Sequence, residues 1–318
     1  MDIVEPKQRE ATIAALAIKA DSDSSNIASV QTCEVRRLRH LHGHADTSAE
    51  VTVEVEQDSV AVEMPVALVF NGVSHAVMML TPNDLEDFAY GFSLTEGIID
   101  KAEQIYDCEV EANQHEGTVG VSIHITLASE KFAALKEKRR FMTGRTGCGL
   151  CGTESLTQAI RQPAPVTHAQ SFSAAAVSKA VASMKTKQSL LEITGATHAA
   201  AFCNAEGDIM LLREDVGRHN ALDKVIGAIM RQQGSAAKLG KQTNVGAATA
   251  VNGFITITSR ASYEMVQKTA CADIGLLAAV SGVTNLAIQV ANNAGVCLLG
   301  FTRGRDAAIY THQQRLTQ

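Results

Sequence analysis

The chain has 318 residues, 46% hydrophobic and 19% charged, which is enough apolar sequence to bury a core in one large or two small domains. Its formal net charge of -6 argues against general nucleic-acid binding, because a protein needs a basic surface to displace the counterions of nucleic acid. No stretch approaches the roughly 18 consecutive apolar residues of a membrane-spanning helix, and no apolar signal-peptide core follows the N-terminus, so we expect a cytoplasmic protein without a membrane partner.

Residues 1–48 show no sustained periodicity, and we expect them to form a mobile N-terminal extension. A run of arginines and histidines covers residues 36–44. Three of its histidines stand at a spacing of two and could suggest a metal site, but no carboxylate or cysteine accompanies them at ligand spacing. We therefore interpret this run as a solvated basic segment.

Residues 49–142 have the pattern of a β-rich subdomain with a helix. Residues 51–56 alternate between apolar and polar side chains, as in a half-buried strand. The Asn71-Gly72 pair between two β-rich runs predicts a hairpin, because both residues tolerate positive φ. Thr81, followed by a proline, is expected to cap the N-terminus of the next helix. A second hairpin and a basic helix complete the subdomain.

Residues 143–171 are expected to form a glycine-rich loop followed by a connection. Cys148 and Cys151 lie in this loop among four glycines, and three arginines are close in sequence. Glycine leaves the backbone free and the thiols unshielded, so both cysteines are expected on an exposed, movable segment. Nearby arginines favour the thiolate, which is the nucleophilic form of cysteine. This combination suits sulfur relay, in which a thiolate attacks a persulfide donor and then delivers the terminal sulfur elsewhere.

Three other interpretations of the cysteine pair stay open. A structural zinc site needs a second CxxC pair or paired histidines, and the other five cysteines stand singly. A thioredoxin-like dithiol expects its CxxC at the start of a helix after a strand, whereas this pair follows a basic helix. The third interpretation is an inert pair of thiols. An odd number of cysteines without framework spacing indicates a reducing compartment in each case.

The C-terminal part, residues 172–318, is expected to be an α/β cofactor-binding core. Strands are expected over residues 198–203, 209–212, 254–259, 276–280 and 296–301, and helices over residues 172–191, 219–232, 262–275 and 284–293. This alternation predicts a largely parallel sheet covered by helices.

Polar residues gather where these predicted strands lead into helices. Residues 214–220 hold two acids, an arginine, a histidine and an asparagine, and Arg260 and Arg303 stand at two further strand ends. Open α/β sheets bind ligands at such edges, and a helix N-terminus offers free N–H groups to an anion. We predict a shared anion-binding pocket, while helix capping by Asp215 or Asn220 stays open as the alternative.

Arg303 belongs to a short segment, residues 300–306, in which two arginines flank a glycine. Arginine matches phosphate oxygens bidentately, and Phe301 could stack on a base. His198, directly before a predicted buried strand, is interpreted instead as a core histidine with satisfied ring nitrogens.

Six motifs resemble the formate dehydrogenase accessory sulfurtransferases, which are the FdhD-type sulfur carriers. The motifs are PVALVFNG (65–72), GFSLTEGII (91–99), GRTGCGLCG (144–152), THAAA (197–201), EDVGRHNALDK (214–224) and SRASYEMVQK (259–268). The resemblance covers about residues 61–312.

The resemblance implies a homodimer of α/β class, with a cytidine-deaminase-like three-layer core and an additional β-hairpin-rich N-terminal region. It implies a sulfurtransferase that takes sulfur from a cysteine desulfurase as a persulfide on Cys148, with Cys151 as its partner. The acceptor is molybdenum cofactor in its bis-guanine dinucleotide form, and the client is formate dehydrogenase. The cofactor is then a bound acceptor, and no permanently bound metal is expected.

The resemblance also implies a cofactor-binding loop, with Arg260 and His219 helping to hold the dinucleotide phosphates. This loop consists of Phe301, Thr302, Arg303, Gly304, Arg305 and Asp306. Family members usually carry a second arginine five residues after the phenylalanine, where this chain has Asp306, and Arg305 comes one residue early. Either the loop tolerates the shift, or phosphate contact relies more on Arg303.

Two functions of other classes are the alternatives. A zinc-binding deaminase-like protein needs a His-x-Glu pair and a Pro-Cys-x-x-Cys motif, but His198 is followed by two alanines and Gly147 precedes Cys148. A cofactor-binding chaperone without sulfur transfer predicts that Cys148→Ala retains function.

Overall fold

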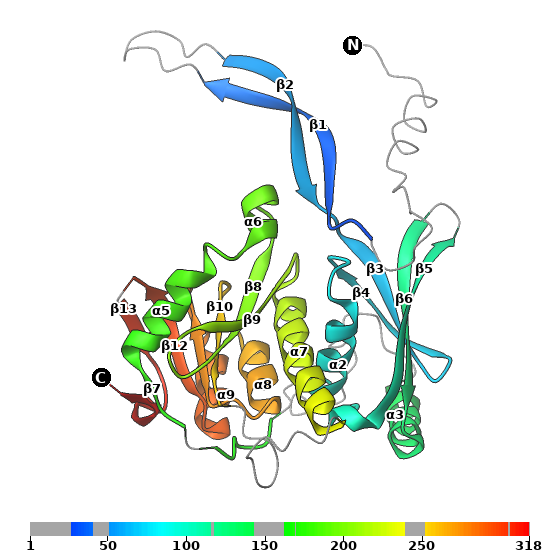
Figure 1. Cartoon of the computed structure of the whole chain (residues 1–318), viewed down its shortest axis with the longest axis vertical. Helices are drawn as coiled ribbons and strands as arrows, with labels where there is room; N and C mark the ends of the chain where they lie inside the picture. Colours follow the sequence, from blue (N-terminus) through cyan, green and yellow to red (C-terminus); the bar gives the residue numbers. More distant parts are fainter. Residues whose placement is uncertain are drawn as a thin grey trace.

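A computed structural model of the chain describes residues 27–40, 51–115, 118–142, 162–168, 170–238, 252–304 and 306–317. Within these residues the strands form a two-stranded arm, a four-stranded sheet, a six-stranded sheet and a short two-stranded pair (Figure 1). The short pair joins β7 (Phe172–Ser173) to β14 (Leu316–Thr317) and so ties the C-terminus to the start of the core. No helix of this described part is long and apolar enough to cross a membrane.

The arm consists of β1 (Val30–His40) and β2 (Val51–Ala61), which pair antiparallel along all 11 residues of each strand. Strand β1 therefore lies within the stretch expected to be a mobile N-terminal extension, residues 1–48, and the basic run begins inside this strand. Residues 1–26 and 41–50 lie outside the described residues. The sequence did not reveal β1 because its second half is rich in arginine, and cross-strand pairing rather than local propensity stabilises such a strand.

The four-stranded sheet has the order β4-β3-β6-β5, in which β3 and β6 are parallel and the outer pairs antiparallel. Its strands are β3 (Met64–Phe70), β4 (Val73–Leu80), β5 (Ile105–His115) and β6 (Thr118–Leu127). The predicted hairpin at Asn71-Gly72 is confirmed, with φ of 45° and 78° at the two residues. Alternate residues of β3 are buried, so one face of the sheet packs on the core. The helices that follow its strands are α2 (Leu85–Thr95), the 3-10 turn η1 (Ala102–Gln104) and α3 (Ser129–Met142).

The prediction that Thr81 caps α2 is wrong. The N-cap of α2 is Asp84, which has a left-handed φ of 53°. Thr81 is fully buried, and its Oγ1 accepts a hydrogen bond from the N–H of Val216 in the other half of the molecule. A Thr-Pro pair suits a helix start, but the chain uses this threonine for a tertiary contact instead.

The six-stranded sheet has the order β13-β12-β11-β10-β8-β9. Its strands are β8 (His198–Cys203), β9 (Ile209–Asp215), β10 (Phe254–Ile257), β11 (Leu276–Ala279), β12 (Cys297–Arg303) and β13 (Asp306–Ile309). Only β10, β11 and β12 pair in parallel, and the other three described pairs are antiparallel. The prediction of a largely parallel sheet is therefore wrong, because β8–β9 and β12–β13 are joined by turns too short for a parallel crossover.

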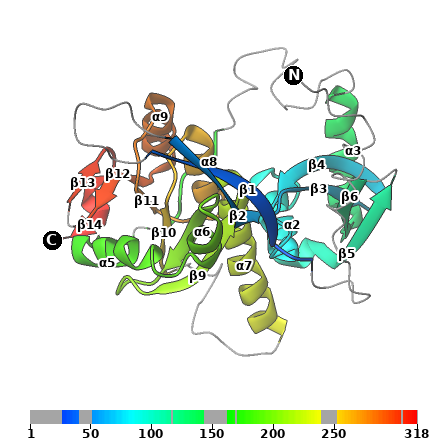
Figure 2. The ribbon, with the colours of Figure 1, turned by 90° about the horizontal axis from the view of Figure 1, so that it is seen from above.

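Helices cover both faces of this sheet and give it three layers (Figure 2). One face packs on α7 (Arg218–Lys238), α8 (Tyr263–Cys271) and α9 (Asn285–Ala294), and the opposite face packs on α5 (Ala174–Met184). The helix predicted over residues 172–191 is in fact α5 followed by a separate short helix, α6 (Ser189–Thr194). The mixed α/β class is confirmed, while the boundaries drawn between domains stay a prediction.

The two halves of the molecule share one core. Helix α2, from the N-terminal half, lies against α7, and the backbones touch where Gly91 faces Asp223 and Gly227 faces Asp87. A single cluster of buried apolar side chains runs from the four-stranded sheet through α2 and α7 to α8 and α9. The position of α7 is therefore fixed from both sides.

Candidate functional site

The carboxyl ends of β10, β11 and β12 meet at one edge of the six-stranded sheet, and α7, α8 and α9 all begin at this edge. Backbone hydrogen bonds hold the three connections together: the N–H of Ala261 donates to the carbonyl oxygen of Gly282 (3.0 Å), and the N–H of Phe301 donates to that of Ser281 (2.9 Å). We call this the binding edge. It is the place where open α/β sheets bind ligands, and three helix N-termini supply free N–H groups to it.

The predicted cofactor-binding loop consists of the last residues of β12, the tight turn after them and the first residue of β13, at the binding edge. Phe301 has a left-handed φ of 52° and is 51% exposed, and a Cβ at Gly282 would lie 3.2 Å from its ring. Arg303 is exposed, and its Nε donates to the carbonyl oxygen of Val280 (3.3 Å). An aromatic side chain and a guanidinium therefore stand two residues apart on β12, and both are exposed to solvent.

The other residues of the predicted cofactor-binding loop are Thr302, Gly304, Arg305 and Asp306. Thr302 is 1% exposed, and its Oγ1 has no hydrogen-bond partner among the described residues. Gly304 has a φ of 60°, which makes the turn possible, and Asp306 pairs with Arg303 in the β12–β13 register. Arg305 lies outside the described residues, so its shifted position stays untested.

His219 stands in the first turn of α7 and faces α8. Its Nε2 lies 2.7 Å from Oε2 of Glu264, and this contact with His219 is the main reason that the pKa of Glu264 lies below its usual value. His198, at the start of β8, is half-buried; burial, and then the positive field of Arg218 and His219, lowers its pKa. Imidazole and guanidinium groups thus gather where β8, β9 and β10 meet.

Arg260 is exposed and lies between β10 and α8, on the same edge as His219 and Arg303. The next residue but one, Ser262, is the N-cap of α8, yet its side chain makes no capping hydrogen bond and its Oγ is buried without a described partner. The N-terminal N–H groups of α8 are therefore not satisfied by their own cap. Together with the basic side chains, they suit an anionic ligand such as a phosphate.

Sequence reasoning missed Glu264 and underrated His198. An acidic residue in the first turn of a helix is ordinarily explained by the helix dipole, so nothing local marked Glu264 as the partner of His219. The interpretation of His198 as a core histidine leaves out its place at the binding edge, where the start of β8 lies because β8 is antiparallel to β10. Its position depends on the direction of β8, which the sequence did not reveal.

Most acidic residues of the 214–224 motif are structural. Asp215 is fully buried: its Oδ2 accepts from Lys224 Nζ (2.7 Å) and from the N–H of Thr81 (3.1 Å), and its Oδ1 accepts from Asn220. Glu214 accepts hydrogen bonds from two backbone N–H groups at the start of α6. These acids anchor α6 and the start of α7, and Asp215 also accepts from the N–H of Gly217, directly before α7.

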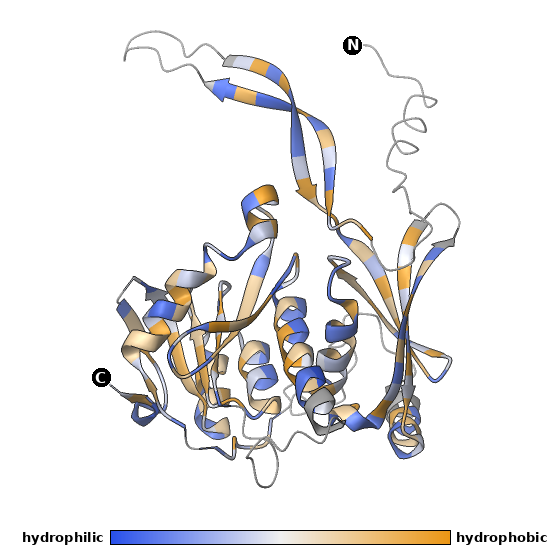
Figure 3. Ribbon diagram, in the orientation of Figure 1, coloured by the Kyte–Doolittle hydropathy of each residue, from blue (hydrophilic) through white to orange (hydrophobic). Residues whose placement is uncertain are grey.

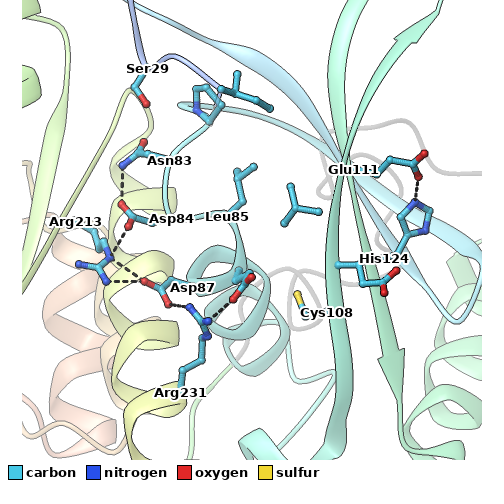
Figure 4. Close-up of a pocket in the computed structure, with 15 residues that line it drawn as sticks. Ser29, Asn83, Asp84, Leu85, Asp87, Cys108, Glu111, His124, Arg213 and Arg231 are labelled. Carbon is cyan, nitrogen blue, oxygen red and sulfur yellow. Dashed lines mark hydrogen bonds and ion pairs between the residues drawn. The ribbon is translucent and has the colours of Figure 1, made fainter. Parts of the chain in front are cut away.

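A separate cavity of about 910 Å³ lies between the start of α2 and strand β5 (Figure 4). Asp87 accepts hydrogen bonds from Arg213 (2.7 Å) and Arg231 (2.6 Å) at its wall, and Glu86 pairs with Arg231 as well. Further carboxylates line the cavity at Asp84, Glu109 and Glu111. Because its arginines are already paired and acids outnumber them, this cavity suits phosphate less well than the binding edge does.

The predicted persulfide cysteines, Cys148 and Cys151, lie outside the described residues, which end at residue 142 and resume at residue 162. Burial raises the pKa of Cys108 to about 12, of Cys203 to about 12 and of Cys297 to about 11. These three thiols are therefore poor sources of thiolate. No group of three or more His, Cys, Asp or Glu side chains in the described ranges is placed to hold a metal ion.

Comparison with known proteins gives consistent results. Residues 61–317 match the model of the FdhD/NarQ family. The chain is 50% identical over 259 residues (81% of this chain and 84% of the relative) to a protein of Cupriavidus necator named sulfur carrier protein FdhD. Proteins of the same name from Variovorax paradoxus and Bordetella petrii are 51% and 48% identical over 82% and 84% of this chain, and over 87% and 89% of their own lengths.

A solved structure has the same fold. It is a crystal structure described as a formate dehydrogenase accessory protein from Desulfotalea psychrophila, and it matches with a TM-score of 0.60 at 21% identity. The match covers 90% of this chain and 99% of that one.

Proposed function

Because the chain belongs to the FdhD/NarQ family, we propose that it is a sulfur carrier that supplies sulfur for the maturation of formate dehydrogenase. The observation that carries the proposal is the identity of about half to relatives named sulfur carrier proteins, over a region that includes both the cysteine loop and the binding edge. We infer a cysteine desulfurase as donor and the bis-guanine dinucleotide form of molybdenum cofactor as acceptor.

The loading step uses Cys148 as nucleophile. Its thiolate attacks the terminal sulfur of the persulfide on the desulfurase, so a Cys148 persulfide forms and the desulfurase cysteine leaves as a thiolate. The acceptor then takes the terminal sulfur. In one route, the Cys151 thiolate attacks the inner sulfur of Cys148; a disulfide forms, sulfur leaves as hydrosulfide, and a cellular dithiol must reduce the disulfide afterwards. In the other route, Cys151 takes the terminal sulfur and relays it as its own persulfide.

The binding edge is the proposed site of the acceptor. Arg303, Arg305 and Arg260 supply the positive charge for the dinucleotide phosphates, and His219 at the start of α7 helps to hold them. The exposed ring of Phe301 supplies a surface on which guanine stacks. Main-chain groups of Thr302, Gly304 and Asp306 shape the turn. The first backbone N–H groups of α8, which the Ser262 side chain does not cap, can donate hydrogen bonds to the same phosphates.

The strand order β9-β8-β10-β11-β12, with an antiparallel β8 and three parallel strands beyond it, supports a cytidine-deaminase-like core. We infer a homodimer that works in the cytoplasm. Its partners are the desulfurase and formate dehydrogenase, without nucleic acid or membrane.

The test is mass spectrometry of the protein after incubation with a cysteine desulfurase and cysteine. We expect an addition of one sulfur, about 32 Da, on the peptide that bears Cys148, absent in Cys148→Ala and present at first loading in Cys151→Ala. Formate dehydrogenase activity in cells that carry Cys148→Ala should be lost. Wild-type protein that acquires no sulfur from an active desulfurase, or a Cys148→Ala variant that supports full activity, would instead support the cofactor-binding chaperone.

A further inference from the structure

The arm formed by β1 and β2 is poorly covered by the rest of the described structure. It extends beyond the binding edge and contacts the body mainly at α6 (Figures 1 and 3). The side chains of Leu38, Val53 and Val55 are 57%, 59% and 60% exposed. An isolated two-stranded sheet is only marginally stable in water, because it has no second layer to bury its apolar side chains against. The arm therefore needs a covering layer.

The two faces of the arm differ in chemistry. One face carries a ladder of ion pairs in which Arg37 bonds Glu56 (3.0 Å) and Asp58 (3.3 Å), and Arg39 bonds Glu54 (3.1 Å) and Glu56 (2.7 Å). These groups satisfy one another and leave this face suited to solvent. Side chains alternate along a strand, so the three exposed apolar residues share the opposite face. We call this opposite face the apolar face of the arm.

The apolar face also carries one cation and one anion. Arg36 lies directly opposite Val55 in the register, and Glu34, two residues earlier, lies opposite Gln57. Neither Arg36 nor Glu34 forms an ion pair with another described side chain. A face with a small apolar cluster, one unpaired positive charge and one unpaired negative charge is complementary to itself.

We propose that the apolar face of the arm docks against the same face of a second copy of this chain. With a two-fold axis along the arm, Leu38 of each copy packs on Val53 of the other, because these two residues stand directly opposite each other in one arm. The aliphatic stem of Arg36 covers Val55 of the second copy, and its guanidinium reaches toward the second copy's Glu34. The exposed Leu38, Val53 and Val55 of both copies are thus buried in one symmetric contact.

The proposal goes beyond the dimer expected for the family, because it names the surface. Most of the arm precedes residue 61, where the match to the family model begins. In the view from above, the arm crosses over α6 toward α8 and α9, above the end of the molecule where those helices begin (Figure 2). A second copy held by the arm thus lies beside the binding edge and limits the direction from which a large partner can approach it.

The first test is sedimentation of the full-length chain over a range of concentrations. We expect Leu38→Glu and Val55→Glu to raise the dissociation constant of the dimer at least about ten-fold, because each places an unpaired carboxylate in the apolar contact. Val77→Glu is the matched control: Val77 is also a strand residue, in β4, and is also 60% exposed. A wild-type monomer at every concentration, or a dimer that both arm variants leave unchanged, overturns the proposal.

A second pair of measurements remains informative if an arm variant folds poorly. Arg36→Glu and Glu34→Arg should each weaken the dimer, and the double variant should restore it, because only a contact between copies regains its opposite charges.

Oxidation of a mixture of Leu38→Cys and Val53→Cys chains should give a covalent dimer, whereas Leu38→Cys mixed with Val77→Cys should give no more than wild type. Absence of both the rescue and the cross-link overturns the proposal. Sulfur loading of Cys148 is measured separately, so its failure is distinguishable from failure of the arm contact.

Discussion

Replacing Gly227 in α7 with alanine should destabilise the protein through a clash between two helix backbones. A Cβ at Gly227 would lie 1.7 Å from the carbonyl oxygen of Asp87 in α2, whereas an ordinary contact begins at 3.4 Å. The difference, 3.4 minus 1.7, means that α2 must move by about 1.7 Å. No side-chain rotation can relieve the overlap, because the obstructing atoms are backbone.

The expected size of the effect follows from two opposing terms. Overpacking of a well-packed contact costs about 3 kcal/mol when the backbone has to shift. Alanine in a helix interior returns about 1 kcal/mol relative to glycine. The net loss in the free energy of unfolding is therefore about 2 kcal/mol. Gly91→Ala should behave in the same way, since its Cβ would lie 1.8 Å from the carbonyl oxygen of Asp223.

Gly234 provides a control on the same helix. A Cβ there would lie 3.5 Å from the Cβ of Ala102, which is an ordinary contact, so Gly234→Ala should gain up to about 1 kcal/mol of stability from helix propensity. Denaturant unfolding followed by circular dichroism measures both variants. Unfolding of Gly227→Ala at the same denaturant concentration as wild type, or a shift of both variants in the same direction, would contradict the predicted backbone clash.

Three further predictions concern the buried ion pair, the binding edge and its pH dependence. Lys268→Met leaves Asp223 buried without its 2.8 Å partner and should cost about 3–5 kcal/mol in denaturant unfolding, and adding Asp223→Asn should recover part of the loss. The pKa of Glu264 is lowered by its contact with His219, so this pairing contributes stability above the ordinary pKa of glutamate and loses it as the pH falls through the lowered value. The difference in melting temperature between wild type and Glu264→Gln should thus be larger at pH 6 than at pH 3, and an unchanged difference would contradict the assignment. Arg303→Ala should weaken binding of a guanine nucleotide in calorimetry by about ten-fold or more, through loss of charge-assisted hydrogen bonds, whereas Arg37→Ala on the arm should leave it unchanged.

Local chemistry predicted the elements whose signals are strong at short range. The Asn71-Gly72 turn needs positive φ at both residues, and the pair occurs between two β-rich runs, so the hairpin was readable from sequence. The buried strands β10, β11 and β12 were readable because each is a short apolar run that ends at polar residues. The positions of Arg260 and Arg303 at one sheet edge followed from those strands.

Features that depend on residues far away in the chain could not be predicted from the sequence. Strand β1 is held by its register with β2, and no apolar alternation marks its arginine-rich half. The direction of β8 depends on its pairing with β10 across about fifty intervening residues. The sequence therefore predicted neither the mixed sheet nor the position of His198 at the binding edge. Thr81 has the local signal of a helix cap, yet its hydroxyl bonds Val216 instead.

The buried charges of the 214–224 motif explain how the binding edge keeps its geometry. Asp215 ends β9 and is bonded to Asn220 and Lys224 of α7, so a strand end and the first two turns of a helix are joined through one carboxylate. Such a network is rigid only while every member is satisfied, because a single unpaired charge in this fully buried position is costly. His219, directly before Asn220, points about 100° around the same helix, is 30% exposed and faces Glu264. The inward residues thus fix where α7 begins, and that position decides where His219 and the free N–H groups of the helix are presented to a ligand.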